Sequence, residues 1–276
     1  MHNRKEYFEF AAFTKTCDDA IQIADALLNN DYATFKKFNL KYSKHTAEKM
    51  RGIDSLSTYK KTSMICNYAS QHSGSICEKC YAEKSIKLYK SALTPALIYN
   101  TLLLKYIDID AQQIPYINNK YFRFESFSDL QGSKHFKNLI QVCKKNKNTI
   151  FTLWTKAGYT LKKMMDDENI QKIPSNLNII VSEFYINKNL IDDEYLNGLQ
   201  SVINSKNNLK CFAVYDDEEK RKNSNMFLLQ FYIIDGCNYS HEYCEKIFNN
   251  QKEFDEYESN LNSSMYELQI ISKKEL

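Results

Sequence analysis

Three cysteines lie close together in the stretch MICNYASQHSGSICEKCYAEK at residues 64–84. Cys77 and Cys80 form a C-x-x-C pair, which places two thiols on one tight turn within reach of a single metal ion or iron–sulfur cluster. Cys66 precedes this pair by a polar loop that can fold back onto it. The spacing C-x10-C-x2-C therefore predicts a cysteine-rich metal loop with Cys66, Cys77 and Cys80 as ligands.

The cellular compartment decides how these thiols are interpreted. The N-terminus lacks the continuous apolar run of a signal peptide, and no stretch approaches the ~20 apolar residues of a membrane span. We therefore expect a cytoplasmic protein without membrane association, whose eight cysteines stay reduced. Closely spaced cysteines in that setting are typical of metal or redox sites.

The number of ligands determines the chemistry of the metal site. We favour a 4Fe–4S iron–sulfur cluster, with zinc as the alternative, and a third interpretation leaves the cysteines without a ligand role. Four ligands would saturate the metal and make it structural, whereas three leave one position open for a substrate or cofactor. The candidates for a fourth ligand are Cys237, Cys244 and His241, while His72 in the loop is a weaker zinc candidate. The remaining cysteines are expected to be small buried hydrophobic residues: Cys17, Cys143 and Cys211.

Polar residues follow three of the expected strands at the point where each strand ends. Functional sites in parallel α/β sheets gather at the carboxyl ends of the strands, so we expect these side chains to share one edge. Carboxylates, an amine and hydroxyls in one place suit a zwitterionic ligand or acid–base chemistry, although no catalytic residue is assigned. The expected ligand pocket consists of Arg123, Glu125, Ser126, Asp129, Lys156 and Ser182. Thr155 and Glu183 are expected to be solvated loop residues instead.

The elements that would position these residues alternate between strand and helix after residue 120. The expected strands are 121–127, 149–155, 176–184 and 209–216, and the expected helices are 133–147, 159–171 and 189–205. Strands joined by such short connections through a helix form right-handed βαβ units. We therefore predict an α/β fold with a parallel sheet or a partial (β/α) barrel.

Two regions complete the expected organisation. Residues 1–50 are expected to form an N-terminal helical extension, and residues 51–276 a single α/β domain with the cysteine loop at 64–82 and a helical C-terminal segment. The polar stretch 51–66 is expected to be irregular. The segment 82–107 is expected to form one long helix, or two helices divided near Pro95.

The composition excludes some classes of function. Six scattered glycines cannot supply a dinucleotide-binding or P-loop motif. A net charge of +3 is too small to indicate a nucleic-acid partner by itself. The basic stretches at 36–51 and 220–222 are therefore expected to be solvated faces.

Several motifs resemble a known family. The run C…CxxCYA from Cys66 to Ala82, the stretch FRFESFSDL and the LWTK that ends at Lys156 are similar to the phage gene-product-88-like family of low-GC bacteria and their mobile elements. The resemblance extends from about Gly52 to Tyr215. Family members usually have a glycine where this chain has Ser128. Members often have a second cysteine-rich group near the C-terminus, and here only Cys237 and Cys244 correspond to it. The resemblance implies a fold context and no settled activity.

The layout is also similar, more distantly, to radical S-adenosylmethionine enzymes. Those enzymes have a three-cysteine loop, then a helix, then a strand whose polar end meets the amino group of the cofactor. By this analogy Glu125 or Asp129 would hold an ammonium group. The usual C-x3-C-x2-C spacing of those enzymes is absent here.

Two functions of different classes follow. The first is a phage or mobile-element metalloprotein in the host cytoplasm, whose iron–sulfur cluster and S-adenosylmethionine would modify an unknown substrate. The alternative is a zinc-stapled binding protein that acts on nucleic acid or on a host defence protein without catalysis. Its contact surface would be the basic segment 36–51 and the many tyrosines.

Overall fold

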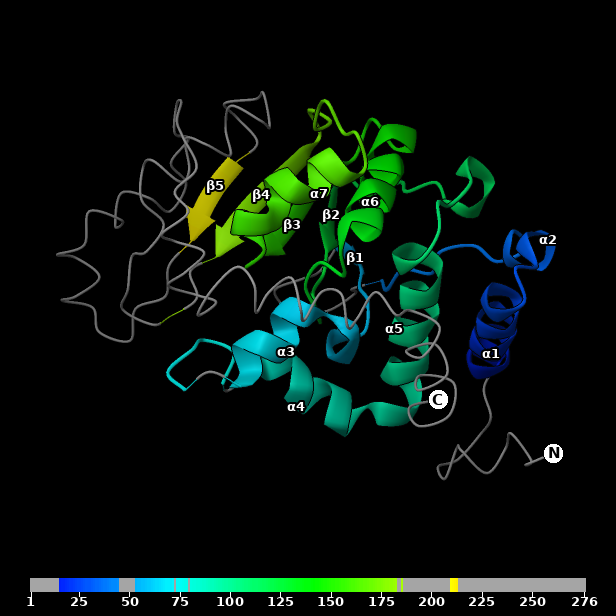
Figure 1. The fold of residues 1–276 in the computed structure, drawn as a ribbon, viewed down its shortest axis with the longest axis horizontal. Helices are drawn as coiled ribbons and strands as arrows, with labels where there is room; N and C mark the ends of the chain where they lie inside the picture. Colours follow the sequence, from blue (N-terminus) through cyan, green and yellow to red (C-terminus); the bar gives the residue numbers. More distant parts are fainter. Residues whose placement is uncertain are drawn as a thin grey trace, which may run out of the picture.

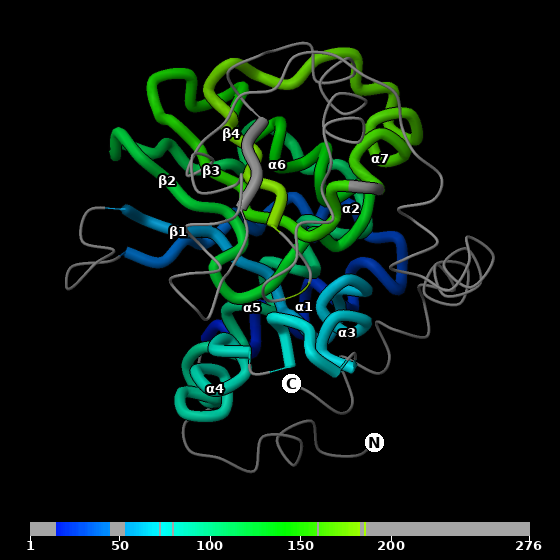
Figure 2. The backbone as a smooth tube through the Cα atoms, turned by 90° about the vertical axis from the view of Figure 1, so that its left-hand side faces the viewer, coloured from blue at the N-terminus to red at the C-terminus, as the bar shows by residue number. Residues whose placement is uncertain are grey.

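The centre of the protein is a parallel five-stranded sheet (Figure 1). The computed structural model describes residues 15–44, 53–71, 73–78, 80–182, 185 and 209–212. The strands are β1 Asp54–Leu56, β2 Tyr121–Phe124, β3 Ile150–Thr155, β4 Leu177–Ser182 and β5 Leu209–Phe212, and they lie in the order β1-β2-β3-β4-β5. The parallel α/β fold expected from the sequence is thereby confirmed. The curved succession of β1 to β4 is visible in Figure 2.

Two helices precede the first strand, and the others occupy the connections between the strands. They are α1 Lys15–Leu28, α2 Tyr32–Phe35, α3 Met64–Gln71, α4 Tyr81–Leu88, α5 Lys90–Lys105, α6 Ser133–Lys145 and α7 Leu161–Asp167, with single 3-10 turns at Lys60–Thr62, Ala111–Gln113 and Gly158–Thr160. Three of them, α3 to α5, connect β1 to β2. In Figure 1 the arrowheads of β4 and β5 point toward the side of the sheet where α3 and α4 lie. The cysteine-bearing connection is therefore at the carboxyl ends of the strands.

The two faces of the sheet differ in polarity because side chains alternate along each strand. Phe122 and Phe124 of β2 are buried on one face together with Phe151 of β3, and the rings of Phe124 and Phe151 stack with centroids 5.0 Å apart. Arg123 and Trp154 lie on the opposite, half-buried face. The sequence alternation thus directs the aromatic rings into the core and leaves the other face for polar contacts.

The N-terminal helix α1 belongs to the same hydrophobic core as the sheet. Ala20, Ile23 and Ala24 of α1 are fully buried, and the helix packs against α5. Leu102 and Leu103 of α5 are also fully buried, so α5 lies between α1 and the rest of the core. The expected helical N-terminal region is confirmed, and it is joined to the α/β core by apolar packing.

Two local expectations were wrong. The stretch expected to be irregular contains β1, whose residues Asp54 to Leu56 are all buried and pair with Phe122 to Phe124 of β2. The segment 82–107 is indeed two helices, but the division is at Tyr89, and Pro95 lies inside α5. Pro95 is the sixth residue of α5, so the helix lacks the one backbone hydrogen bond that residue 95 would donate to Ser91.

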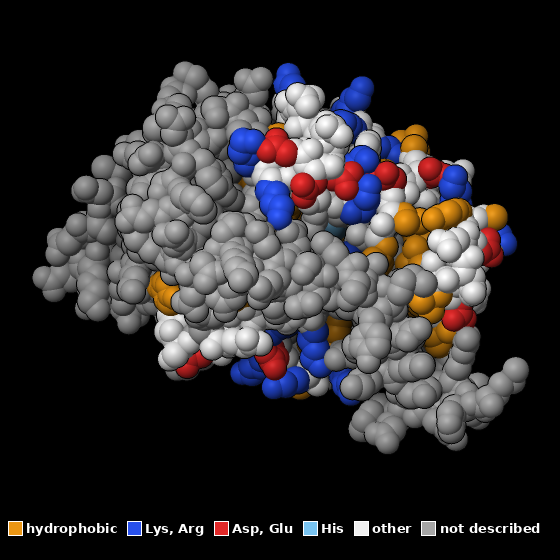
Figure 3. All heavy atoms as spheres, in the orientation of Figure 1, with side chains coloured by type: hydrophobic (Ala, Val, Ile, Leu, Met, Phe, Trp, Pro, Cys, Tyr) orange, Lys and Arg blue, Asp and Glu red, His pale blue; other side chains and the backbone are white. Residues whose placement is uncertain are grey.

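Charged side chains are mixed on the face that carries α6 and α7 (Figure 3). Lys134 and Lys137 each lie within 3.1 Å of carboxylate oxygens of both Asp108 and Glu168. This face is therefore not a uniformly basic surface.

Two lysines in the described part of the basic segment 36–51 are paired in the same way. Lys36 contacts Asp110 and Lys41 contacts Asp19, each at 2.9 Å.

In the described ranges, no helix is long and apolar enough to cross a bilayer. The expected helix 189–205, the C-terminal helical segment and the stretch 220–222 lie outside the described residues.

Candidate functional site

A cavity of about 410 Å³ opens at the carboxyl ends of the strands. It is lined by the connection after β1 and by the ends of β2, β3 and β4. Every described residue that the sequence analysis proposed for the site lines this strand-end cavity: Cys66, Cys77, Cys80, Arg123, Glu125, Ser126, Asp129, Lys156 and Ser182. The structure thus brings the cysteine loop and the expected ligand pocket together, while their roles stay predictions. Cys237, Cys244, His241, His72 and Glu183 lie outside the described residues.

The three cysteines reach the cavity from different local structures. Cys66 is in the first turn of α3, where its backbone N–H donates to Ser63 Oγ at 3.3 Å. The Ser63 hydroxyl in turn donates to the carbonyl oxygen of Leu130 at 3.1 Å. Cys80 immediately precedes α4, and Cys77 lies in the turn that leads to it. The start of α3 is therefore tied directly to the loop after β2.

The three thiols form no disulfide, and the surroundings of Cys66 and Cys77 oppose ionisation. Burial, followed by the nearby Asp129 carboxylate, raises the pKa of the Cys66 thiol well above its ordinary value. Burial also raises the pKa of Cys77, although the neighbouring Lys156 ammonium acts in the opposite direction. Both thiols are therefore protonated at neutral pH in the metal-free chain, and metal binding would release protons.

The donor set suits a soft metal, but its arrangement is open. Three thiols on one cavity are the ligand type that iron–sulfur clusters and zinc prefer. Over the described ranges, no three His, Cys, Asp or Glu side chains are placed closely enough to hold a metal ion. The three thiols are thus of the chemical type that these metals bind, but they would have to move closer together to hold one.

The other cysteines differ from these three. Cys17 on α1 and Cys143 on α6 are buried among apolar residues, as expected for small hydrophobic side chains. Cys211 lies in β5.

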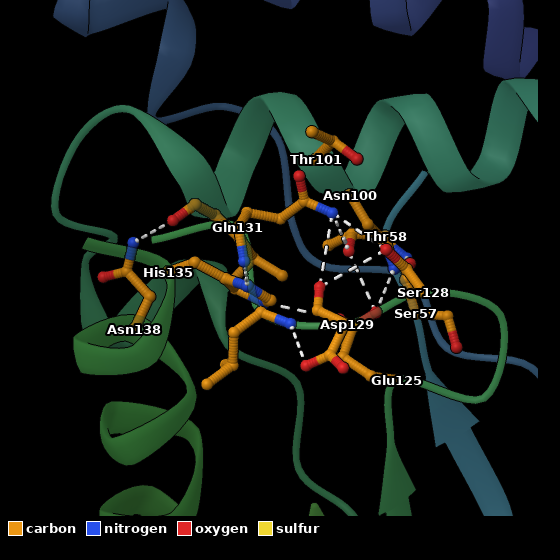
Figure 4. A network of polar contacts seen from close by, with 12 residues as sticks. Ser57, Thr58, Asn100, Thr101, Glu125, Ser128, Asp129, Gln131, His135 and Asn138 are labelled. Atoms are coloured by element: carbon orange, nitrogen blue, oxygen red, sulfur yellow. Dashed lines mark hydrogen bonds and ion pairs between the residues drawn. The ribbon is translucent and has the colours of Figure 1, made fainter. Parts of the chain in front are cut away.

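Glu125 is held inside a buried polar network (Figure 4). It follows β2 with a backbone φ of 53°, a left-handed conformation that is uncommon for a residue with a side chain. Its Oε2 accepts hydrogen bonds from the backbone N–H and the hydroxyl of Thr58, at 3.1 and 2.9 Å. Its Oε1 faces Nε2 of His135 at 3.4 Å. The carboxyl group thus links the loop after β1 to helix α6.

The electrostatics of this pair follow from burial. Burial raises the pKa of Glu125 to about 8, which the hydrogen bonds from Thr58 only partly oppose. Burial also lowers the pKa of His135 to about 3, assisted by the Lys105 ammonium. His135 Nδ1 accepts the backbone N–H of Gln131 at 3.0 Å, so the ring proton of the neutral histidine is on Nε2. Both groups are therefore neutral at pH 7.

Asp129 joins the ends of two strands. Its Oδ1 accepts from the backbone N–H of Leu130 at 2.7 Å and from the hydroxyl of Thr155 in a short contact. Its Oδ2 accepts from the backbone N–H of Lys156 at 2.8 Å. Burial nevertheless leaves the pKa of Asp129 raised. The expectation that Thr155 is solvated was wrong, because its hydroxyl is required inside this buried network and the residue is 1% exposed.

Cationic and hydroxyl groups form the remaining polar part of the cavity. The Arg123 guanidinium lies 5.8 Å from the ring centroid of Trp154, and Lys156 Nζ donates to Ser182 Oγ at 2.9 Å. The backbone of Ser126 is fixed by its N–H, which donates to Ser57 Oγ at 2.9 Å, and by its carbonyl, which accepts from the Tyr81 hydroxyl. Within the described part of the chain, Arg123 Nε and Ser126 Oγ are buried without a hydrogen-bond partner.

Sequence reasoning missed several residues of the site. Thr58, Gln131 and His135 support Glu125 from segments far apart in sequence, and Trp154 and Tyr81 line the cavity. Gln131 lies just before α6 and His135 lies in its first turn, so the two residues are only four positions apart in the sequence. That spacing was the one available signal.

Comparisons with known proteins give the family but no activity. No curated protein matches the chain, and no solved structure matches it. The expected similarity to radical S-adenosylmethionine enzymes is therefore not supported by a comparison. The family model described as gene product 88 matches residues 26–249, a range that includes the cysteine loop and all strands of the sheet. The chain therefore belongs to the gene product 88 family, as its motifs indicated.

Proposed function

We propose that this protein is a metalloprotein of the phage gene product 88 family that holds an iron–sulfur cluster at Cys66, Cys77 and Cys80. The observation that supports this most directly is that all three thiols line one cavity although they come from a helix, a turn and a helix start. The same cavity contains the polar ends of three parallel strands. Such strand ends are where α/β proteins bind small molecules.

A buried lysine beside the thiols favours a negatively charged metal site. Lys60 is only 6% exposed, and its Nζ lies 2.8 Å from Glu83 Oε2. Burial lowers the pKa of Lys60, but the hydrogen bond to Glu83 outweighs burial and leaves the pKa raised, and thiolates at Cys80 and Cys66 would raise it further. A cluster held by three thiolates carries net negative charge, which an ammonium group at this position would balance.

Three cysteine ligands would leave one iron available to a small molecule, and we propose S-adenosylmethionine as that molecule. A reduced cluster would supply an electron to the bound molecule. The chain's own residues would bind and orient it: Arg123, Ser126, Lys156 and Ser182 line the space next to the thiols. Trp154 and the aliphatic residues of α3 would exclude water. This part of the proposal rests on the layout of the cavity.

The test is the metal content of protein purified without oxygen. We expect the wild-type chain to contain iron and sulfide in equal amounts, and Cys77→Ala to lose most of both because a cluster ligand is missing. Cys17→Ala is the matched control, since Cys17 is a buried thiol on α1 away from the cavity. It should retain the wild-type iron and sulfide.

Two results would contradict the proposal. One zinc ion per chain that is lost in Cys77→Ala would mean that the cysteines hold a structural zinc ion. That result would favour the binding-protein alternative. Full iron and sulfide in Cys77→Ala would remove this cysteine from the ligand set.

A further inference from the structure

The two carboxylates that the sequence analysis expected to hold an ammonium group already accept hydrogen bonds from the protein, whereas two donors at the strand-end cavity have no partner in the described ranges. Both oxygens of Asp129 accept protein hydrogen bonds, and Oε2 of Glu125 accepts two from Thr58. Glu125 Oε1 is buried without a hydrogen bond, but it faces His135 Nε2 at 3.4 Å, and burial keeps this carboxyl group neutral at pH 7. A ligand cation therefore finds little free negative charge here.

Two donors without a partner lie at the end of β2. Arg123 Nε is buried, and so is the hydroxyl of Ser126, a residue only 7% exposed; neither has a hydrogen-bond partner in the described ranges. Both residues line the cavity. A buried donor without a partner is unfavourable, so such groups commonly mark the position of a ligand atom.

The position of Arg123 suits an anion. Its guanidinium lies over the ring of Trp154, which limits the rotation of a long side chain before any ligand binds. The planar guanidinium matches the paired oxygens of a carboxylate or phosphate better than any other side chain. Lys156 brings a second positive charge to the same cavity. The volume of about 410 Å³ is within the range of pockets that hold small organic molecules.

We propose that the β2 end of this cavity is an anion subsite, in which Arg123 and Ser126 donate hydrogen bonds to a carboxylate or phosphate group of a small molecule. This inference rests on the proposed function only in that both place the ligand in one cavity. It reverses the polarity expected from the sequence, because the group received at the end of β2 is an anion and not an ammonium group.

The experiment is calorimetric titration of the protein as isolated without oxygen, with two pairs of probes. S-adenosylmethionine is compared with decarboxylated S-adenosylmethionine, which lacks only the carboxylate, and adenosine monophosphate is compared with adenosine. We expect at least one probe that carries the carboxylate or phosphate to bind about tenfold or more tightly than its counterpart that lacks this group. The pair that shows the difference identifies the anion as carboxylate or phosphate.

Variants test the assignment to residues. Arg123→Gln should remove most of the preference for the anionic probe, and Ser126→Ala should reduce it by a smaller factor. Lys162→Gln is the matched control, because Lys162 is an exposed cation on α7 that pairs with Asp166. It should bind all four probes as the wild type does. If Arg123→Gln does not fold, the Ser126→Ala comparison decides the matter.

The outcomes separate this inference from the proposed function. Equal binding within both probe pairs, or no binding of any probe, would overturn the subsite, whatever the iron content. An anion preference unchanged in both variants would overturn the assignment to Arg123 and Ser126. Anion binding in a protein without iron and sulfide would support the subsite and contradict the cluster.

Discussion

Glu125 shows how burial sets the chemistry of a single residue. The sequence places a carboxylate at the end of a strand, and a charged, open ligand for an ammonium group was the natural expectation. The structure directs the carboxyl group to Thr58 and His135, where burial keeps it neutral up to about pH 8. The residue has a left-handed backbone conformation, and the next residue, Ser126, also lines the cavity.

This placement predicts a pH-dependent stability. The pKa of Glu125 is raised from 4.5 in the unfolded chain to about 8 in the folded one, so the folded state holds a proton that the unfolded state has lost between these values. The contribution of Glu125 to the free energy of unfolding therefore falls as pH rises through this window, by up to about 1.4 kcal/mol per pH unit. Glu125→Gln should remove that slope. The measurement is urea unfolding at several values between pH 5 and 9, and parallel curves for the two proteins would contradict the prediction.

Asp129 supports a prediction about hydrogen bonds between strand ends. Asp129→Ala should lower the free energy of unfolding by about 2–4 kcal/mol, because the N–H groups of Leu130 and Lys156 and the Thr155 hydroxyl would lose a shared buried acceptor. Urea unfolding measures the change.

Asp108 offers the control for this prediction. Its side chain is 56% exposed and pairs with surface lysines, so Asp108→Ala should change stability by about 0.5 kcal/mol or less. Similar losses in the two variants would mean that the Asp129 network adds nothing beyond a surface pair.

At the scale of elements, strands and helices with strong sequence periodicity could be predicted, whereas a short strand that forms only by pairing with a neighbour could not. The strands β2, β3, β4 and β5 and the helix α6 were expected within a few residues of their observed bounds, because aromatic and β-branched runs and a helical apolar pattern mark them. Strand β1 was missed because Asp54, Ser55 and Leu56 show no pattern of their own. They become a strand through pairing with β2.

The location of the site could be predicted from the sequence, but the contacts between its side chains could not. The rule that sites gather at the carboxyl ends of parallel strands was enough to bring together every proposed cavity residue that the structure describes. The rule says nothing about which side chains satisfy one another. The burial of Thr155 and the contact of Glu125 with His135 depend on side-chain packing between segments, which no local pattern in the sequence encodes.

At the scale of the whole molecule, one core extends from α1 to the sheet. Ile23 on α1 is fully buried in the cluster that includes α5 and the phenylalanines of β2. Ile23→Ala should therefore lower the free energy of unfolding by about 2–5 kcal/mol and destabilise the sheet together with the helix. Hydrogen exchange resolved along the chain can test this. Faster exchange in α1 alone, with unchanged protection in β2 and β3, would mean that the N-terminal helix folds separately.

The position of Trp154 has an optical consequence. It is the single tryptophan of the chain, and it lies on the same cavity as the three thiols. Iron–sulfur clusters absorb across the wavelengths of indole emission, whereas zinc does not absorb light there. A chain carrying a cluster should therefore be dim in fluorescence through energy transfer, and should brighten as the cluster is removed, while a zinc-loaded chain should be bright from the start. The protein thus has an intrinsic fluorophore next to the place where its metal is proposed to bind.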